Sequence, residues 1–336
     1  MKNDIGVDIG TANTLIYMKT KGIVVNEPSV VALDKEYKSV LAVGTEAKEM
    51  LGKTPSAILS VCPIREGVIA EFDTAQSMLK SFVRKAFSKK AFVKSRVVAC
   101  VPINVTAVEK QVIKDALINS GAREVFVVEK PMAAAIGANL PVSEPIASMI
   151  VDIGCGTTEI AVISLGGIVC GKTVKIAGGS FDRAVEKYIK RAHALLIGEQ
   201  TAEKIKIELG SAFDVNDGET LEVSGSDYMT GLPKNAVITA EEIRGALKDS
   251  LMGIIEAIKD VLEDTPPELS ADIIERGITL TGGGALLKGI DSLIKKEVGM
   301  PVYIADEPKE CTANGTGIIL DDIDLIRKDS LYLSAK

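Results

Sequence analysis

The stretch IGVDIGTANTLI at residues 5–16 returns in altered form as MIVDIGCGTTEI at residues 149–160. In both copies a short apolar run ends in Asp-Ile-Gly, and a small polar turn leads into a second apolar run. Each copy predicts two strands joined by a tight turn, with Gly10 and Gly154 at the bend, where a residue without Cβ fits most easily. Because the copies are a domain's length apart, they indicate two similar α/β halves produced by duplication.

The turn in each copy suits a phosphate group. Glycine at the apex lets successive backbone N–H groups converge, and such a nest binds phosphate. Asp8 and Asp152 end the preceding strands, where a carboxylate can hold Mg²⁺ through water. One copy alone would fit an ordinary glycine-rich hairpin equally well. Two copies at domain spacing favour a triphosphate that is held from both sides.

A third glycine-rich segment, LTGGGALL, covers residues 280–287. We expect a strand at 278–280, then Gly282, Gly283 and Gly284, and a helix that begins at Ala285. Glycines there would let a ribose or a flat ring approach the main chain, at a helix N-terminus that favours anions. The segment is not a Walker A loop, because no Gly-Lys-Ser/Thr follows the glycines.

The rest of the chain alternates between strand and helix patterns. Continuous apolar runs at 96–101 and 124–128 predict strands that are buried on both faces. Helical patterns cover 106–120, 132–139, 182–196 and 241–263. Thr106 and Glu109 have the spacing of a capping box. The alternation predicts mainly parallel or mixed sheets that are covered by helices.

Composition excludes several classes of protein. The chain has 336 residues, enough for two domains, and a net charge of −7, which argues against nucleic acid as a partner. Its five cysteines form no C-x-x-C pair, and its single histidine, His193, offers no basis for Ser/His/Asp chemistry. No signal peptide and no apolar run of ~20 residues is present, so we expect a cytoplasmic protein.

The order of these motifs resembles the ATPase superfamily of actins, sugar kinases and heat-shock chaperones. Within it, the chain is similar to the MreB family of bacterial actins, from about Asp4 to about Leu325. The segments that carry this resemblance include GIVVNEPSVVAL (22–33), VGTEAKEMLGKTP (43–55), GVIAEF (67–72), AAAIGANLPV (133–142), GTTEIAVISLGGIV (156–169), TPPELSADIIERGITLTGGGALL (265–287) and NGTG (314–317).

The resemblance implies an actin-like fold, an α/β architecture of two duplicated ribonuclease-H-like domains with a nucleotide in the central cleft. Each domain would carry a smaller inserted subdomain. Domain I would comprise residues 1–144 plus 310–336, with its insertion at about 33–66. Domain II would comprise residues 145–309, with its insertion at about 180–242.

The resemblance also assigns roles to residues, with ATP and Mg²⁺ as the expected ligands. The phosphates would contact Thr11, Ala12, Asn13, Gly154, Cys155 and Gly156. Asp8 and Asp152 would order the metal, while Lys130, Thr157 and Asp152 would occupy the hydrolytic site. Glu203 and Lys206 would lie near the ribose and adenine, and Gly282, Gly283, Gly284 and Ala285 would pack against the nucleoside. Without the resemblance, residues 203–208 would be read as a charged helix face.

Lys130 departs from the family pattern, which has Glu-Glu-Pro where this chain has Glu129-Lys130-Pro131. The second Glu of that pattern polarises the attacking water, and a protonated Lys cannot accept a proton. Losing a positioned base typically costs a factor of ~10²–10⁴ in rate. We therefore expect a paralogue that binds ATP normally but hydrolyses it slowly. A cation facing the γ-phosphate would also stabilise the unhydrolysed state.

Two further departures lie close to the expected cleft. Cys155 replaces a family Gly, and its Cβ would crowd the phosphate nest. Gly178-Gly179-Ser180 stands where the family has Gly-Asp-Glu, which removes two carboxylates. The sequence gives no account of the second change.

A basic segment with apolar residues suggests a membrane-binding face. It contains Lys85, Lys89, Lys90, Lys94 and Arg96 around Phe87, Phe92 and Val93. Exposed apolar tips within a basic patch suit an anionic leaflet, and the family inserts an apolar loop here. Phe92 and Val93 would be the inserted residues. The alternative is a solvated connecting loop.

The family resemblance implies filaments built from antiparallel protofilament pairs at the inner face of the cell membrane. The helix at 106–120 is the candidate pairing surface, and other MreB-like paralogues are expected partners. Such filaments would govern cell shape, or helicity and motility. The alternative is a soluble sugar kinase, which would need a catalytic Asp between the domains, or a chaperone-type ATPase, which would need a peptide-binding domain.

Overall fold

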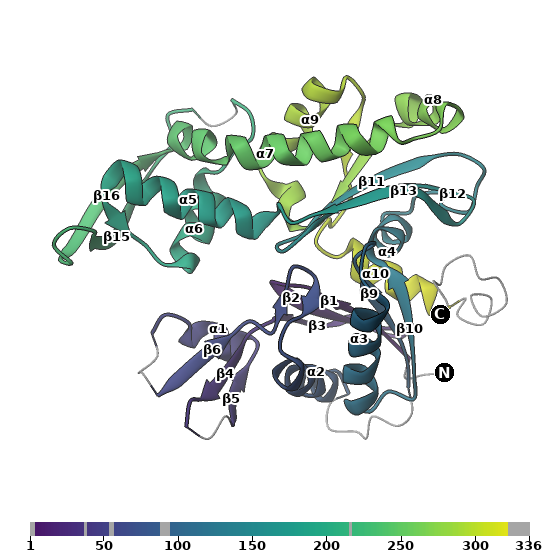
Figure 1. The fold of residues 1–336 in the computed structure, drawn as a ribbon, viewed down its shortest axis with the longest axis horizontal. Coiled ribbons are helices and arrows are strands. Elements are labelled where there is room, and N and C mark those ends of the chain that lie inside the picture. Colours follow the sequence, from purple (N-terminus) through teal and green to yellow (C-terminus); the bar gives the residue numbers. More distant parts are fainter. Residues whose placement is uncertain (1–3, 37–38, 54–56, 88–94, 215–216, 322–336) are drawn as a thin grey trace.

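Two halves of similar topology make up the computed structural model, which describes residues 4–36, 39–53, 57–87, 95–214 and 217–321 (Figure 1). The first half contains a sheet in the order β10-β9-β1-β2-β3, and the second a sheet in the order β13-β12-β11-β17-β18. In each sheet the first strand of the half runs antiparallel to the next strand and parallel to a later one. The duplication that the repeat predicts is therefore present in the strand order.

The first sheet consists of β1 (Ile5–Ile9), β2 (Asn13–Met18), β3 (Gly22–Pro28), β9 (Arg96–Val101) and β10 (Glu124–Glu129). The second consists of β11 (Ser148–Ile153), β12 (Thr158–Ser164), β13 (Gly167–Val174), β17 (Ile278–Thr281) and β18 (Val302–Ile304). Every residue of β1, β9, β11 and β12 is buried. The prediction of burial on both faces is therefore confirmed for β9, whereas β10 is buried only at Phe126, Val127 and Val128.

Two helices join the halves. They are α4 (Lys130–Gly137) and α10 (Cys311–Ile319), which lie against each other between the two sheets (Figure 1). A Cβ on Gly137 would collide with the carbonyl oxygen of Cys311, and one on Gly315 with that of Ala133. The two helix backbones therefore touch directly. Residues of β9, α4, β11, β12 and α10 share one hydrophobic cluster, so the halves have a common core at this junction.

The remaining helices cover the outer faces. In the first half they are α2 (Phe72–Ala86) and α3 (Ala107–Asn119), packed against each other. In the second half α7 (Ala240–Glu263), α8 (Pro267–Arg276) and α9 (Ile290–Val298) pack against strands of the main sheet, while α5 (Gly178–His193) and α6 (Glu199–Leu209) pack against each other and against α7. The apolar face predicted for the long helix is buried in the core of the second half at Ile243, Leu247, Leu251, Ile254 and Ile258, and Leu262 at its end is only partly buried.

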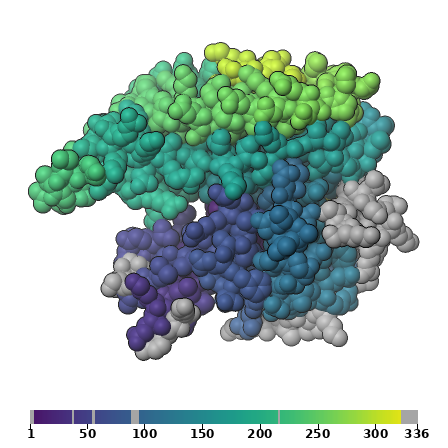
Figure 2. Space-filling view, viewed as in Figure 1, coloured from purple at the N-terminus to yellow at the C-terminus, as the bar shows by residue number. Residues whose placement is uncertain are grey.

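A small subdomain projects from each half. One contains β4 (Val31–Asp34), β5 (Val40–Val43), α1 (Thr45–Met50) and β6 (Ile58–Val61), followed by β7 (Ile64–Arg65) and β8 (Val68–Ile69). The other contains β14 (Leu195–Leu196), β15 (Thr220–Asp227) and β16 (Pro233–Thr239). The sheet of β14, β15 and β16 lies within the insertion expected at about 180–242, and the sheet of β4, β5 and β6 begins at Val31, two residues before the insertion expected at about 33–66. The domain boundaries themselves stay predictions. Figure 2 shows a notch between the two projecting parts.

Local predictions met different outcomes. The capping box of Thr106 and Glu109 is confirmed at the start of α3. The helix expected from Ala285 is wrong, because residues 283–286 form only a 3₁₀ turn, η1 (Gly283–Leu286), and α9 begins at Ile290. Gly282 and Gly289, both at positive φ, bend the chain on either side of that turn.

The helix expected at 182–196 begins earlier, at Gly178, and ends at His193. The helix expected at 132–139 begins at Lys130.

The expected membrane face is only partly within the described residues. Phe92 and Val93 lie outside them, together with Lys89, Lys90 and Lys94. Phe87 is buried in the core of the first half rather than exposed, and Arg96 is buried in an ion pair with Asp4 at 2.8 Å. The apolar tip at Phe87 and the free cation at Arg96 were therefore wrong expectations. Within the described ranges, no helix combines the length and apolar character needed to cross a membrane.

Candidate functional site

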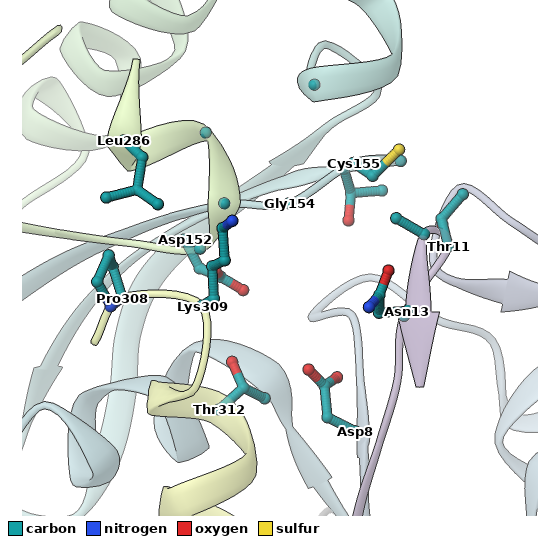
Figure 3. Close-up of a pocket in the computed structure, with 18 of the residues that line it drawn as sticks. Asp8, Thr11, Asn13, Asp152, Gly154, Cys155, Leu286, Pro308, Lys309 and Thr312 are labelled. Atoms are coloured by element: carbon teal, nitrogen blue, oxygen red, sulfur yellow. The ribbon is translucent and has the colours of Figure 1, made fainter. Parts of the chain in front are cut away.

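Both Asp-Ile-Gly loops line one cavity of about 360 Å³ between the two halves (Figure 3). The structure brings together at this cavity nearly all the residues expected from the sequence: Asp8, Thr11, Ala12, Asn13, Lys130, Asp152, Gly154, Cys155, Gly156, Thr157, Glu203, Lys206, Gly282, Gly283 and Gly284. Ala285 is instead fully buried in the core of the second half.

The two loops make the same turn. The Gly10 N–H donates to the Asn13 carbonyl at 3.0 Å, and the Gly154 N–H donates to the Thr157 carbonyl at 2.9 Å. The loops also approach each other, because a Cβ on Gly156 would collide with Oγ1 of Thr11. Two nests this close can act on one phosphate chain.

Side-chain hydrogen bonds support the first loop. The Ser29 hydroxyl donates to the Gly10 carbonyl at 2.7 Å and lies 2.9 Å from the hydroxyl of Thr14. The Asn13 amide donates to Asn26 at 2.7 Å, and the Gly67 N–H donates to Oγ1 of Thr11 at 3.2 Å. Residues of β2 and β3, with Ser29 just after β3 and Gly67 between β7 and β8, therefore fix this loop from within its own half.

Close backbone packing supports the second loop. The N–H of Gly178 donates to the Gly154 carbonyl at 3.0 Å, and the N–H of Gly179 donates to the Cys155 carbonyl at 2.9 Å. Gly282 lies at φ +80°, where a Cβ would collide with both Oδ1 of Asp152 and the Ile153 carbonyl. Glycines at these positions let the start of α5 and the end of β17 approach the loop.

Two of the departures from the family pattern touch each other. A Cβ on Gly179 would lie 3.2 Å from the carbonyl oxygen and 3.5 Å from the sulfur of Cys155. The added side chain at 155 thus faces a position without one at 179, which accounts for part of the Gly178-Gly179-Ser180 change. Burial, and then the charge of Asp182, raise the pKa of the Cys155 thiol, so it stays protonated.

Lys130 ends beside the two expected metal-binding carboxylates. Its Nζ lies 3.6 Å from Oδ1 of Asp8 and 3.6 Å from Oδ2 of Asp152. Burial opposes the charge of Lys130, but Asp8 and then Asp152 outweigh burial and raise the pKa of the lysine. Burial raises the pKa of Asp8, and the charge of Lys130 counteracts this. The carboxylate pair thus already has a cation, so its surroundings do not fit the Mg²⁺ expected from the sequence.

The two residues expected near the nucleoside make ion pairs. Glu203 meets Lys48 at 3.1 Å, and Gln200 donates to the Lys48 carbonyl at 2.9 Å. These contacts connect α6 with α1, so they span the mouth of the cleft between the two small subdomains. Lys206 meets Asp182 at 2.8 Å.

Sequence reasoning missed part of the cavity wall. Phe181, Leu286, Pro308, Lys309 and Thr312 also line the cavity, and Figure 3 shows several of them opposite the Asp8 loop. Pro308 and Lys309 lie on the segment that returns from β18 to α10. No local pattern marks them, because only the return of the chain to the first half brings them here.

Comparison with known proteins identifies the family. A model of the MreB/Mbl protein family matches residues 2–328. The cell shape-determining protein Mbl of Bacillus cereus is 51% identical over 328 residues, which cover 98% of each chain. Crystal structures of MreB5 of Spiroplasma citri bound to ADP and to AMPPNP are 37% and 36% identical, with TM-scores of 0.92 and 0.93. Both matches cover 97% of this chain and 98% of the other, and they confirm the actin-like fold.

Proposed function

The chain belongs to the MreB/Mbl family, and from this premise we propose that it is an ATP-binding bacterial actin that forms membrane-associated filaments. The observation that carries the proposal is the cavity in which both Asp-Ile-Gly loops face one space. The nucleotides in the two MreB5 structures support an adenine nucleotide there. Since the similar Mbl is a cell shape-determining protein, we extend that role, or one in helicity or motility, to this chain.

Slow hydrolysis is part of the proposal. Lys130 occupies the position of the expected water-activating Glu, and its ammonium is held by Asp8 and Asp152. A protonated amine cannot accept a proton from water, whereas Thr157, the other residue expected in the hydrolytic site, also lines the cavity. This proposal does not include the Mg²⁺ expected with the ATP, because Asp8 and Asp152 already face the ammonium of Lys130.

Phosphate release tests the hydrolytic part. The wild type should release phosphate slowly, and Lys130→Glu should release it at least about tenfold faster, because it restores a base. Equilibrium binding of ATP to both proteins is the control, since a change in affinity alone would not alter the rate at saturation. Fast release by the wild type, or no gain in the variant, would contradict this part of the proposal.

Filament formation and membrane contact need their own tests. Electron microscopy of the purified protein with ATP, with ADP and without nucleotide should show paired protofilaments, with the most polymer in ATP. Pelleting with anionic liposomes should decrease for a Phe92→Ser/Val93→Ser double variant. Polymer-free protein in every nucleotide state would reject filament formation, and unchanged pelleting would reject the membrane contact.

The family match does not favour a sugar kinase or a chaperone-type ATPase.

A further inference from the structure

Lys130 connects the two halves electrostatically at the site where a metal was expected. Asp8 lies in β1 of the first half and Asp152 in β11 of the second, yet one ammonium is 3.6 Å from an oxygen of each. The exposed fractions of these side chains are only 9% for Asp8 and 3% for Asp152. Two buried carboxylates that face each other are unfavourable unless a positive charge lies close to both.

The ammonium also lies beside the backbone expected to hold phosphate. A Cβ on Gly154, at the bend of the second loop, would be 4.0 Å from Nζ of Lys130. A lysine ammonium has three N–H donors. At 3.6 Å the contacts with Asp8 and Asp152 are ion pairs rather than close hydrogen bonds, so an N–H donor is left to face an oxygen of a phosphate group. Lys130 can therefore link the carboxylates to the nucleotide, as a metal ion would.

A divalent ion would have to share this space. Mg²⁺ bound directly to an aspartate oxygen lies at about 2.1 Å, and Nζ of Lys130 is 3.6 Å from the nearest oxygen of each aspartate. An ion on either of these oxygens would be within about 6 Å of the ammonium, and such charges repel strongly where little water screens them. In the described ranges, neither this cleft nor any other place brings three His, Cys, Asp or Glu side chains together as a metal site.

We propose that the ammonium of Lys130 takes the place of the divalent cation expected in this cleft, so that the protein binds the nucleoside triphosphate without a bound metal ion. The inference rests on the proposed function, because it presupposes that ATP occupies the cavity. It differs from slow hydrolysis, since it concerns what holds the nucleotide and not what activates water.

Calorimetric titration of the full chain with ATP tests the inference, once with excess Mg²⁺ and once with excess EDTA. For the wild type the two Kd values should agree within about threefold, about 0.7 kcal/mol. For Lys130→Met and Lys130→Glu, EDTA should weaken binding by more than about tenfold, because Asp8 and Asp152 then need a metal ion. Circular dichroism in EDTA verifies that the variants are folded.

Lys206→Met is the matched control, because Lys206 lines the same cavity but pairs with Asp182. Its affinity should fall equally with and without Mg²⁺, which leaves the ratio of the Kd values near that of the wild type. Wild-type binding that requires Mg²⁺ would overturn the inference and leave ATP binding intact. This arm needs no variant. Absence of binding in both buffers would overturn the proposed function and the inference together.

Discussion

The loop after β1 and the loop after β11 make the same turn, with N–H to carbonyl distances of 3.0 and 2.9 Å. Their surroundings differ. Hydroxyl and amide side chains hold the first loop, whereas close approach of glycines holds the second. A side-chain hydrogen bond tolerates small shifts, but a backbone contact that excludes even a Cβ does not. Duplication thus preserved the turn, and each half acquired its own support for it.

Gly282→Ala should break the glycine-supported loop with the largest effect. The new Cβ would collide with Asp152 and the Ile153 carbonyl, at a φ of +80° that favours glycine. Strain and overpacking together should cost about 2–5 kcal/mol of the free energy of unfolding, measured by urea denaturation. Gly283→Ala is the control, because its nearest atom would be 4.0 Å away. Equal losses in both variants would show that the contact at Gly282 is unimportant.

Gly156→Ala probes the place where the two loops meet. Its Cβ would collide with Oγ1 of Thr11, so we expect a loss of about 1–3 kcal/mol in the free energy of unfolding. Thr11→Ala removes that oxygen, and the double variant should lose less than the sum by at least about 0.5 kcal/mol. The control is a double variant of Gly156→Ala with Ser224→Ala, on the exposed surface of β15, whose loss of stability should equal the sum of the two single losses. Strict additivity in both cycles would mean that the loops do not touch.

Ser29→Ala tests the side-chain support of the first loop. It removes the donor to the Gly10 carbonyl and leaves the buried hydroxyl of Thr14 without this partner. Removal of one partner from such a buried bond costs about 1–2 kcal/mol, which thermal unfolding can resolve. Ser224→Ala alone should change stability by less than about 0.5 kcal/mol. A loss as large as that of Gly282→Ala would remove the distinction between the two loops.

Low pH should affect the two halves differently at the residues just before their first strands, β1 and β11. Arg96 overcomes the effect of burial and lowers the pKa of Asp4, just before β1, whereas before β11 the Ala147 N–H donates to Asp272. The stability from Asp4 is complete above the usual Asp pKa of about 3.9 and falls as the pH drops through the lowered value. In that pH range the free energy of unfolding of the wild type should therefore fall more steeply than that of Asp4→Asn, by up to about 1.4 kcal/mol per pH unit. Parallel urea midpoints for both proteins between pH 5 and pH 3 would contradict this.

Prediction from sequence succeeded where one segment carries the information. The Asp-Ile-Gly repeat predicts both turns and the duplicated halves, and the family resemblance predicts the actin-like fold and most of the residues that line the cavity. Prediction failed at Ala285, because three glycines permit a turn as readily as a helix start. It could not anticipate that Lys130 ends beside Asp8 and Asp152, since that depends on how α4 is set between the sheets. Pro308 and Lys309 depend on the return of the chain.

The contacts of Lys48 with Glu203 and Gln200 have a kinetic consequence. They join α1 to α6 across the mouth of the cleft, so we expect them to slow the exit of a nucleotide from the cavity until they separate. In a filament protein with fast cleavage, the chemical step sets how long a subunit keeps its triphosphate. Under the slow hydrolysis that we propose for Lys130, residence time would instead depend on the opening of that mouth. Salt weakens surface ion pairs, so ionic strength would act on the lifetime of the ATP-bound subunit.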